Sequence, residues 1–232
     1  MTGRPPGEIA GDGKPSAGRR RLSGLATDWR DPQYLLKRPM FEHVRESRGY
    51  AKGKLLDVGC GNRPYHEVFR DDVSSYVGLD PDRRGSRPDV VGRANALPFA
   101  DGSFDTVLSI AVIEHVPEPD RMLDEIHRVL CGGGHLILLA PQYWRLHEEP
   151  DDYFRFTRYG LEHLARSRGF ALVDMRAQGG AWNVAGQAIC GTLEHRPRLR
   201  RLIPLVNFCF SQLDRRKPDP KDTISYLMIA RK

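Results

Sequence analysis

The feature that most constrains the fold of this chain is a series of short apolar segments separated by helical patterns. The segments predict strands over Lys54–Val58, Tyr76–Leu79, Val90–Val91, Thr106–Ile110, His135–Ala140, Phe170–Met175 and Thr223–Ala230. Helices are predicted over Pro119–Leu130, with Gly132–Gly134 ending the first, and over Thr157–Arg168. Strands that alternate with helices require crossover connections, so the pattern predicts an α/β fold with a mostly parallel sheet covered by helices on both faces.

The N-terminal region falls outside this alternation. Residues 1–28 contain few large apolar side chains and a run of arginines, which predicts a disordered basic tail whose removal leaves the domain intact. Residues 29–232 are then expected to form a single domain. It begins with one or two short helices between residues 32 and 48, interrupted by Pro39.

The segment before the last strand is a second departure. Residues 177–222 are too many for a simple connection and contain two apolar stripes at helical spacing, so they predict a helical insertion or lid. The formal net charge of the whole chain is +6, and Arg176 to Lys221 alone contains nine Lys or Arg against three Asp or Glu. This basic amphipathic character allows a peripheral membrane contact through residues 199–217, and the apolar stripes allow a homodimer.

Several classes of protein are excluded by composition. No apolar run approaches the roughly 20 residues that span a bilayer, and the first residues lack the apolar core of a secretory signal. The four cysteines show no C-x-x-C spacing. We therefore expect a cytoplasmic protein with neither a disulfide framework nor a metal site.

A glycine turn follows the first strand directly, with the sequence Asp57-Val58-Gly59-Cys60-Gly61. In an open α/β sheet, ligands bind beyond the carboxyl ends of the strands, and glycine lets the backbone approach them closely. Asp80, followed by Pro81, ends the next strand, where a carboxylate can accept both hydroxyls of a ribose. A dinucleotide fingerprint needs a third glycine where this chain has Pro64, so the turn predicts a nucleoside site and disfavours a pyrophosphate site.

These residues resemble the first motif of class I S-adenosylmethionine-dependent methyltransferases, in particular the type 11-like methyltransferase domain. The resemblance continues through Asn95-Ala96-Leu97-Pro98-Phe99, Ile113-Glu114-His115-Val116 and Glu125–Leu130, and it covers about Lys54 to Met175. It implies a Rossmann-like, seven-stranded, mostly parallel sheet with an antiparallel last strand, and an enzyme that uses S-adenosylmethionine. The cofactor-binding residues that it implies are Asp57, Gly59, Cys60, Gly61, Asp80, Pro81, Asn95, Ala96 and Ser109.

Two residues depart from the family pattern. Arg63 stands where the family has a third glycine, and we expect it to reshape the loop near the methionine end of the cofactor. Asn95 stands where the family has an acid, yet its carbonyl oxygen can still accept a hydrogen bond from the adenine amino group. Glu114 and His115 are expected to cap and orient the helix that follows them.

The acceptor side is expected in the loop over residues 142–157, which is crowded with aromatic and acidic side chains. His147 has an ordinary pKa of about 6.5 and is predicted to act as general base toward a hydroxyl acceptor, with Glu148 or Asp151 orienting it. The alternative is that His147, Tyr153 and Arg155 only form hydrogen bonds within an ordered loop.

Three functions follow from this sequence. The favoured one is methyl transfer to a small molecule, on an oxygen of a sugar or secondary metabolite. The second is methyl transfer to a lipid-linked or nucleic-acid substrate, although the Asn-Pro-Pro-aromatic motif of base methylation is absent after the fourth strand, where Ser109-Ile110-Ala111-Val112 stands. The third is a nucleoside-binding scaffold without turnover, which the departures at Arg63 and Asn95 favour.

Overall fold

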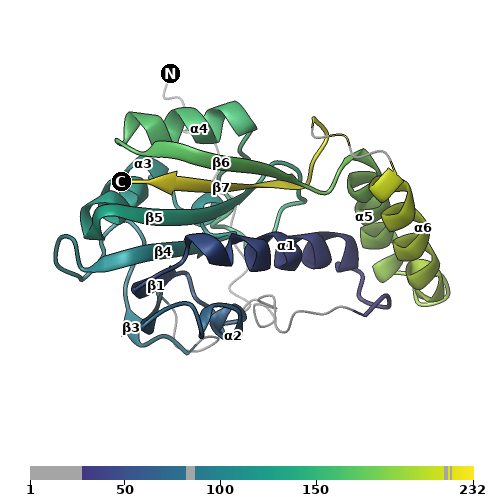
Figure 1. The fold of residues 1–232 in the computed structure, drawn as a ribbon. Coiled ribbons are helices and arrows are strands. Elements are labelled where there is room, and N and C mark those ends of the chain that lie inside the picture. The colour runs from purple at the N-terminus through teal and green to yellow at the C-terminus, as the bar shows by residue number, and fades with distance from the viewer. Residues whose placement is uncertain (1–27, 82–86, 217–218, 220) are drawn as a thin grey trace, which may run out of the picture.

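A seven-stranded sheet forms the centre of the computed structural model, which describes residues 28–81, 87–216, 219 and 221–232 (Figure 1). The strands are β1 Lys54–Val58, β2 Ser75–Asp80, β3 Val90–Val91, β4 Phe104–Ile110, β5 Leu130–Pro141, β6 Ala171–Gln178 and β7 Ser225–Arg231. The α-helices are α1 Tyr34–Glu46, α2 His66–Phe69, α3 Pro119–Val129, α4 Arg158–Ser167, α5 Ala181–Glu194 and α6 Ile203–Arg216. Short 3-10 turns span Ser47–Tyr50, Ile113–His115 and Arg200–Leu202. The tail predicted over residues 1–28 lies outside the described residues apart from Asp28.

The strand order confirms the predicted fold class. The order is β3-β2-β1-β4-β5-β7-β6, with β1 to β5 parallel to one another and β7 antiparallel to both β5 and β6. Asp57 pairs with Gly78 of β2 and with Leu108 of β4. The carboxyl ends of the central strands therefore meet at one edge of the sheet, as the glycine-turn argument requires.

Apolar side chains from alternate strand positions fill two cores, one on each face of the sheet. Leu56, with α3 and α4, belongs to one core, and Leu55, with α1, belongs to the other. Both leucines are fully buried. Helices thus cover both faces, which explains why the strands read as continuous apolar runs in the sequence.

Pro39 does not interrupt the first helix, contrary to the prediction. Helix α1 continues through it from Tyr34 to Glu46. Pro39 lies in the second turn, where its missing N–H removes one bond of the helical ladder. The buried side chains Leu35, Met40 and Val44 anchor the helix on both sides of the proline, and this packing outweighs the lost bond.

The sequence predicted that the triple glycine ends α3, and this prediction is wrong. The helix already ends at Val129, and Gly132–Gly134 lies within β5. Gly133 has φ +77 and donates to the carbonyl of Lys232 at 3.0 Å. A Cβ on Gly134 would lie 3.0 Å from two backbone carbonyl oxygens. The glycines thus allow a close approach between backbone segments.

The segment before β7 is helical, as predicted, but its buried face is polar. Asn207 of α6 donates to the carbonyls of Trp29 and Asp31, at 2.7 and 2.9 Å. The Asp214 carboxylate accepts from the N–H of Gly180 at 3.0 Å and of Asn183 at 3.2 Å, which caps the start of α5. These hydrogen bonds compensate for burying polar groups.

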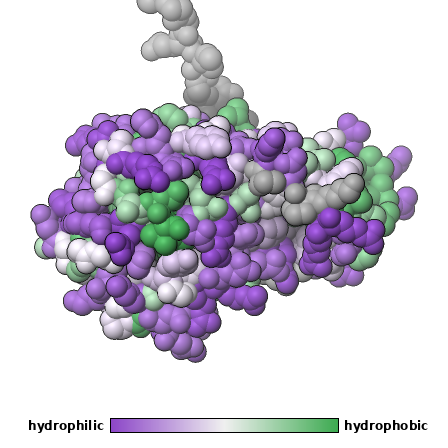
Figure 2. Space-filling model, turned by 45° about the horizontal axis from the view of Figure 1, so that its top comes forward, coloured by the Kyte–Doolittle hydropathy of each residue, from purple (hydrophilic) through white to green (hydrophobic). Residues whose placement is uncertain are grey.

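Many apolar side chains of α5 and α6 consequently face outward, although Ile203 is fully buried. Figure 2 shows hydrophobic side chains gathered among hydrophilic ones at the end of the molecule that these helices form. The exposed apolar side chains there include Trp182, Ile189, Leu202, Leu205 and Phe208. The lid, homodimer and membrane contacts stay predictions, and among the described residues no helix is both long and apolar enough to cross a bilayer.

Candidate active site

A pocket of about 1200 Å³ opens at the carboxyl ends of β1, β2 and β4. Pockets for small ligands typically measure about 300–1,000 Å³, so this one lies slightly above the usual range. Most of the predicted site residues line it, namely Asp57, Gly59, Cys60, Gly61, Asp80, Pro81, Asn95, His147 and Glu148. The sheet edge and the loop after β5 therefore contribute to one cavity.

The glycine turn is fastened to the end of β2. The N–H groups of Gly59 and Cys60 both donate to the carbonyl of Leu79, at 2.8 and 3.0 Å, and Gly61 donates to Oδ2 of Asp80 at 3.1 Å. Gly59 has φ +75, and a Cβ there would lie 2.4 Å from Cγ2 of Val112. From the sequence, a ligand was expected beside the Cα of Gly59. The structure places the side chain of Val112 there.

The two acids at this edge differ in their partners. The Asp80 side chain is buried and lines the pocket. Asp57 accepts a hydrogen bond from the hydroxyl of Tyr76 at 2.5 Å, and burial raises the pKa of Asp57 to about 7. Burial also raises the pKa of the Cys60 thiol to about 12, so Cys60 stays protonated at neutral pH and is not a nucleophile.

Arg63 adopts φ +56, in the left-handed region that glycine occupies without strain. Its guanidinium does not line the pocket. It contacts Asp89 at 2.5 Å and the carbonyl of Arg87 at 2.8 Å, and Asp89 also accepts from the N–H of Gly78. Arg63 thus joins the glycine turn to the segment that precedes β3.

The wall that follows β3 includes the predicted Asn95 but begins two residues before it. It is formed by Arg93, Ala94 and Asn95, and Ala96 is exposed outside the pocket. The sequence contains Ala94-Asn95-Ala96, so the polar-residue-then-alanine pair of the family pattern fits either Arg93-Ala94 or Asn95-Ala96. Asn95 donates through Nδ2 to Glu118 at 3.2 Å, which fixes its amide beside the pocket.

Ser109 does not line the pocket either, contrary to the prediction. It is fully buried within β4, between β1 and β5, and the pocket begins one residue later at Ile110. Its hydroxyl oxygen has no hydrogen-bond partner among the residues that the structure describes.

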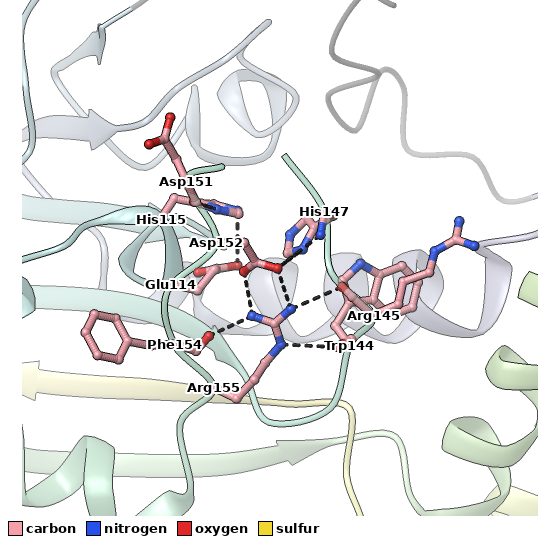
Figure 3. A network of polar contacts seen from close by, with 9 residues as sticks. All are labelled: Glu114, His115, Trp144, Arg145, His147, Asp151, Asp152, Phe154 and Arg155. Carbon is pink, nitrogen blue, oxygen red and sulfur yellow. Dashed lines mark hydrogen bonds and ion pairs between the residues drawn. The ribbon is translucent and has the colours of Figure 1, made fainter. Parts of the chain in front are cut away.

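Asp152 is the centre of a polar network in the loop after β5 (Figure 3). Arg155 donates through both terminal nitrogens to the two oxygens of Asp152, at 2.6 and 2.8 Å. Asp152 also accepts from the backbone N–H of His147 at 3.0 Å, and its Oδ2 lies 3.2 Å from Nδ1 of the same ring. The predicted orienting residues, Glu148 or Asp151, are therefore replaced by Asp152.

The backbone explains this replacement. Glu148 has φ +53, and the N–H of Asp151 donates to the carbonyl of Glu148 at 3.2 Å. The chain thus turns back on itself between residues 148 and 151, which brings Asp152 against His147. Glu148 lines the pocket from the outer side of this turn.

Arg155 also links two parts of the loop through hydrogen bonds to the backbone. It donates to the carbonyls of Trp144, Arg145 and Phe154 at distances from 2.7 to 3.2 Å. The hydrogen-bonded loop that the sequence analysis kept as an alternative is therefore present. His147 and Tyr153 nevertheless line the pocket, whereas Arg155 stands behind them.

Glu114 and His115 do not cap α3, contrary to the prediction, and both line the pocket. They lie in the Ile113–His115 turn, and the backbone carbonyl of Glu114 accepts from the N–H groups of Tyr153 and Phe154. His115 Nδ1 lies 2.6 Å from the carbonyl oxygen of Asp151, and the rings of His115 and His147 are 4.6 Å apart in an edge-to-face arrangement.

Burial controls the charges of this cluster. Burial raises the pKa of Glu114 to about 8 and lowers the pKa of His147, to which nearby His115 and Arg155 also contribute. The hydrogen bond from Arg155 holds the pKa of Asp152 far below its ordinary value. At neutral pH His147 is thus a neutral imidazole beside an ionised carboxylate.

The central part of the chain matches a known family. The model of a methyltransferase domain matches residues 56–138, which include the glycine turn, Asp80 and Glu114. Residues 56–138 are therefore similar to a methyltransferase domain. The match contains most of the pocket's sheet edge but not the loop that carries His147.

Curated methyltransferases are similar to less than half of this chain. An uncharacterized methyltransferase of Mycobacterium leprae (strain Br4923) is 39% identical over 101 residues, covering 39% of this chain and 37% of that protein. One from Mycobacterium sp. (strain KMS) is 42% identical over 99 residues, covering 39% of each. The matched stretch therefore spans less than two fifths of the length of these relatives.

Solved structures share the fold over more of the chain. The cyclase SpnF is 21% identical with a TM-score of 0.61, covering 88% of this chain and 85% of that one. An S-adenosylmethionine dependent methyltransferase from Mesorhizobium loti is 16% identical with a TM-score of 0.54, covering 87% and 98%. One of these two proteins is named a cyclase and the other a methyltransferase, so the shared fold does not determine the reaction.

Proposed function

We propose that this protein transfers the methyl group of S-adenosylmethionine to an oxygen atom of a small molecule such as a sugar or secondary metabolite. One observation carries the proposal. A single large pocket is lined both by the glycine turn with Asp80 and by a histidine–carboxylate cluster. The first part suits a nucleoside, and the second suits a polar acceptor.

The donor end fits the nucleoside part of S-adenosylmethionine. Asp80 lines the pocket with a carboxylate that accepts from the N–H of Gly61, and a carboxylate in this position can accept ribose hydroxyls. The glycine turn lets backbone approach the ligand, and the carbonyl oxygen of Asn95 is the acceptor for the adenine amino group.

The acceptor end supplies orientation and a base. When bound, S-adenosylmethionine supplies a methyl group on a positively charged sulfur, which keeps the bonding electron pair as the acceptor oxygen takes the methyl. Holding the acceptor at attack distance provides most of the acceleration. Nε2 of His147 accepts the hydroxyl proton, because its Nδ1 faces Asp152 and the ring is neutral. Asp152 then stabilises the charged imidazole.

Calorimetric titration with S-adenosylmethionine tests the donor end. Asp80→Asn removes the charge while keeping an oxygen for the N–H of Gly61, and we expect at least a tenfold loss of affinity, since a hydrogen bond to a charged group is worth about 1.5–3 kcal/mol. Asp71→Asn, an exposed aspartate before β2, is the matched control and should bind like the wild type. Equal affinities for a folded Asp80→Asn protein and the wild type would overturn the assignment.

A further inference from the structure

We propose that Glu114, His115 and His147 bind a divalent transition-metal ion at the acceptor end of the pocket. Each of the three offers one ligand atom, and these atoms all lie within 4.8 Å of one another. Two imidazoles and one carboxylate are a ligand set of catalytic zinc and non-haem ferrous sites. The binding itself does not depend on the proposed methyl transfer, whereas its chemical consequence does.

The strongest support for a bound ion is the side chain of Glu114, which is buried with one carboxyl oxygen unpaired. It is 1% exposed, and its Oε2 has no hydrogen-bond partner in the part of the chain that the structure describes. The carboxyl group accepts a hydrogen bond from the backbone of Glu114 itself, and Oε1 is 3.8 Å from Nε2 of His115, beyond hydrogen-bond distance. Buried carboxylates are normally paired, hydrogen-bonded or bound to a metal, and Glu114 lines the pocket.

Both histidines are oriented as metal ligands are. The carbonyl oxygen of Asp151 can only accept a hydrogen bond, so its 2.6 Å contact places the proton of His115 on Nδ1. The Asp152 carboxylate does the same for Nδ1 of His147. In the neutral form of each ring, Nε2 is then the nitrogen that can bind a metal. A metal-binding histidine usually donates its other N–H to a carbonyl or carboxylate in this way.

The cluster needs only a small contraction to bind an ion. Zinc ligands at about 2.0–2.2 Å in a tetrahedral arrangement lie about 3.4 Å apart, so the widest separation has to close by roughly 1.4 Å. His147 lies in a loop that contacts the Ile113–His115 turn, where a rotation of its side chain can supply this movement. Three protein ligands then leave a fourth position open toward the pocket.

A bound cation changes how the acceptor is activated. The ion would hold the acceptor hydroxyl at the open position and make its O–H bond easier to break, and water would take the proton because His147 would then be a ligand and not the base. The oxygen then forms its bond to the methyl carbon as the bond between that carbon and sulfur breaks. The sequence analysis expected no metal site because it considered cysteine spacing. The ligands proposed here are an adjacent Glu–His pair and a histidine of a distant loop.

The test is cation binding by the full-length, untagged protein after chelator treatment and dialysis, without S-adenosylmethionine or acceptor. Co²⁺ is titrated while its visible absorption is recorded, and Zn²⁺ is titrated by calorimetry. We expect one ion per chain, with affinity at least tenfold weaker in each of Glu114→Gln, His115→Ala and His147→Ala. Mg²⁺, which prefers oxygen ligands, should not displace Co²⁺. His163→Ala on α4, an exposed histidine away from the cluster, should bind like the wild type.

Two results would overturn the proposal. One is the absence of stoichiometric binding by the wild type, and the other is equal binding by the wild type and the three cluster variants. Glu114→Gln keeps the size of the side chain, and circular dichroism identifies any variant that fails to fold. Calorimetry with S-adenosylmethionine on the same preparation separates the two proposals, since cation binding without cofactor binding refutes only the proposed function.

Discussion

Replacing Asp57 with asparagine should remove part of the pH dependence of stability. Asp57 is 3% exposed, and burial raises its pKa from 3.8 to about 7. Between these two values the folded protein keeps a proton that the unfolded chain has released, so the free energy of unfolding falls as pH rises. A difference of about 3 pH units corresponds to about 4 kcal/mol, because one unit is worth about 1.4 kcal/mol.

Urea unfolding of the wild type and Asp57→Asn between about pH 4 and pH 8 measures this effect. The asparagine oxygen can still accept the hydroxyl of Tyr76, and the amide does not titrate. Other titrating groups are common to both proteins and cancel in the difference. The free energy of unfolding of the variant minus that of the wild type should increase as pH rises, by about 4 kcal/mol over the whole range. A difference that stays constant across this range would refute the reasoning.

Three further substitutions test the turn and the loop. Gly59→Val has to adopt a left-handed backbone, which costs roughly 1–2 kcal/mol, and meets Val112, so its urea midpoint should fall and a wild-type midpoint would contradict the geometry. Arg155→Lys loses the paired contact with Asp152, so kcat/KM for the acceptor should fall about tenfold while the Kd of S-adenosylmethionine stays constant. An equal loss of cofactor affinity would contradict a role of Arg155 at the acceptor end alone. His147→Ala should lower turnover about 10²- to 10⁴-fold with unchanged S-adenosylmethionine affinity, and near-normal turnover on an alcohol acceptor would remove His147 from its activation.

The sheet was predictable because its signal is local. A strand buried on both faces is a continuous apolar run, and β1 and β3 have the predicted bounds. Pro39 and Gly132–Gly134 misled the prediction because tertiary packing and strand pairing decide their effect. The apolar stripes of α5 and α6 indicated helices correctly, but periodicity does not tell which face is buried when polar side chains find hydrogen-bond partners inside.

The site divides in the same way. Asp57, the glycines and Asp80 follow strand ends directly, so topology alone brings them to one edge. The pairing of His147 with Asp152 depends on a backbone turn at Glu148, a non-glycine residue with positive φ that no sequence pattern announces. The clustering of Glu114 with His147 depends in turn on where that loop packs.

Methyl transfer itself is the most direct test of this account. The purified protein is incubated with methyl-labelled S-adenosylmethionine and a panel of sugars and other hydroxylated metabolites, with and without added Zn²⁺. We predict that the label appears in a small molecule as one added methyl group on oxygen, and that Asp80→Asn abolishes this transfer at low cofactor concentration. Tight binding of S-adenosylmethionine by the wild type without transfer to any acceptor would contradict the account and identify a nucleoside-binding scaffold.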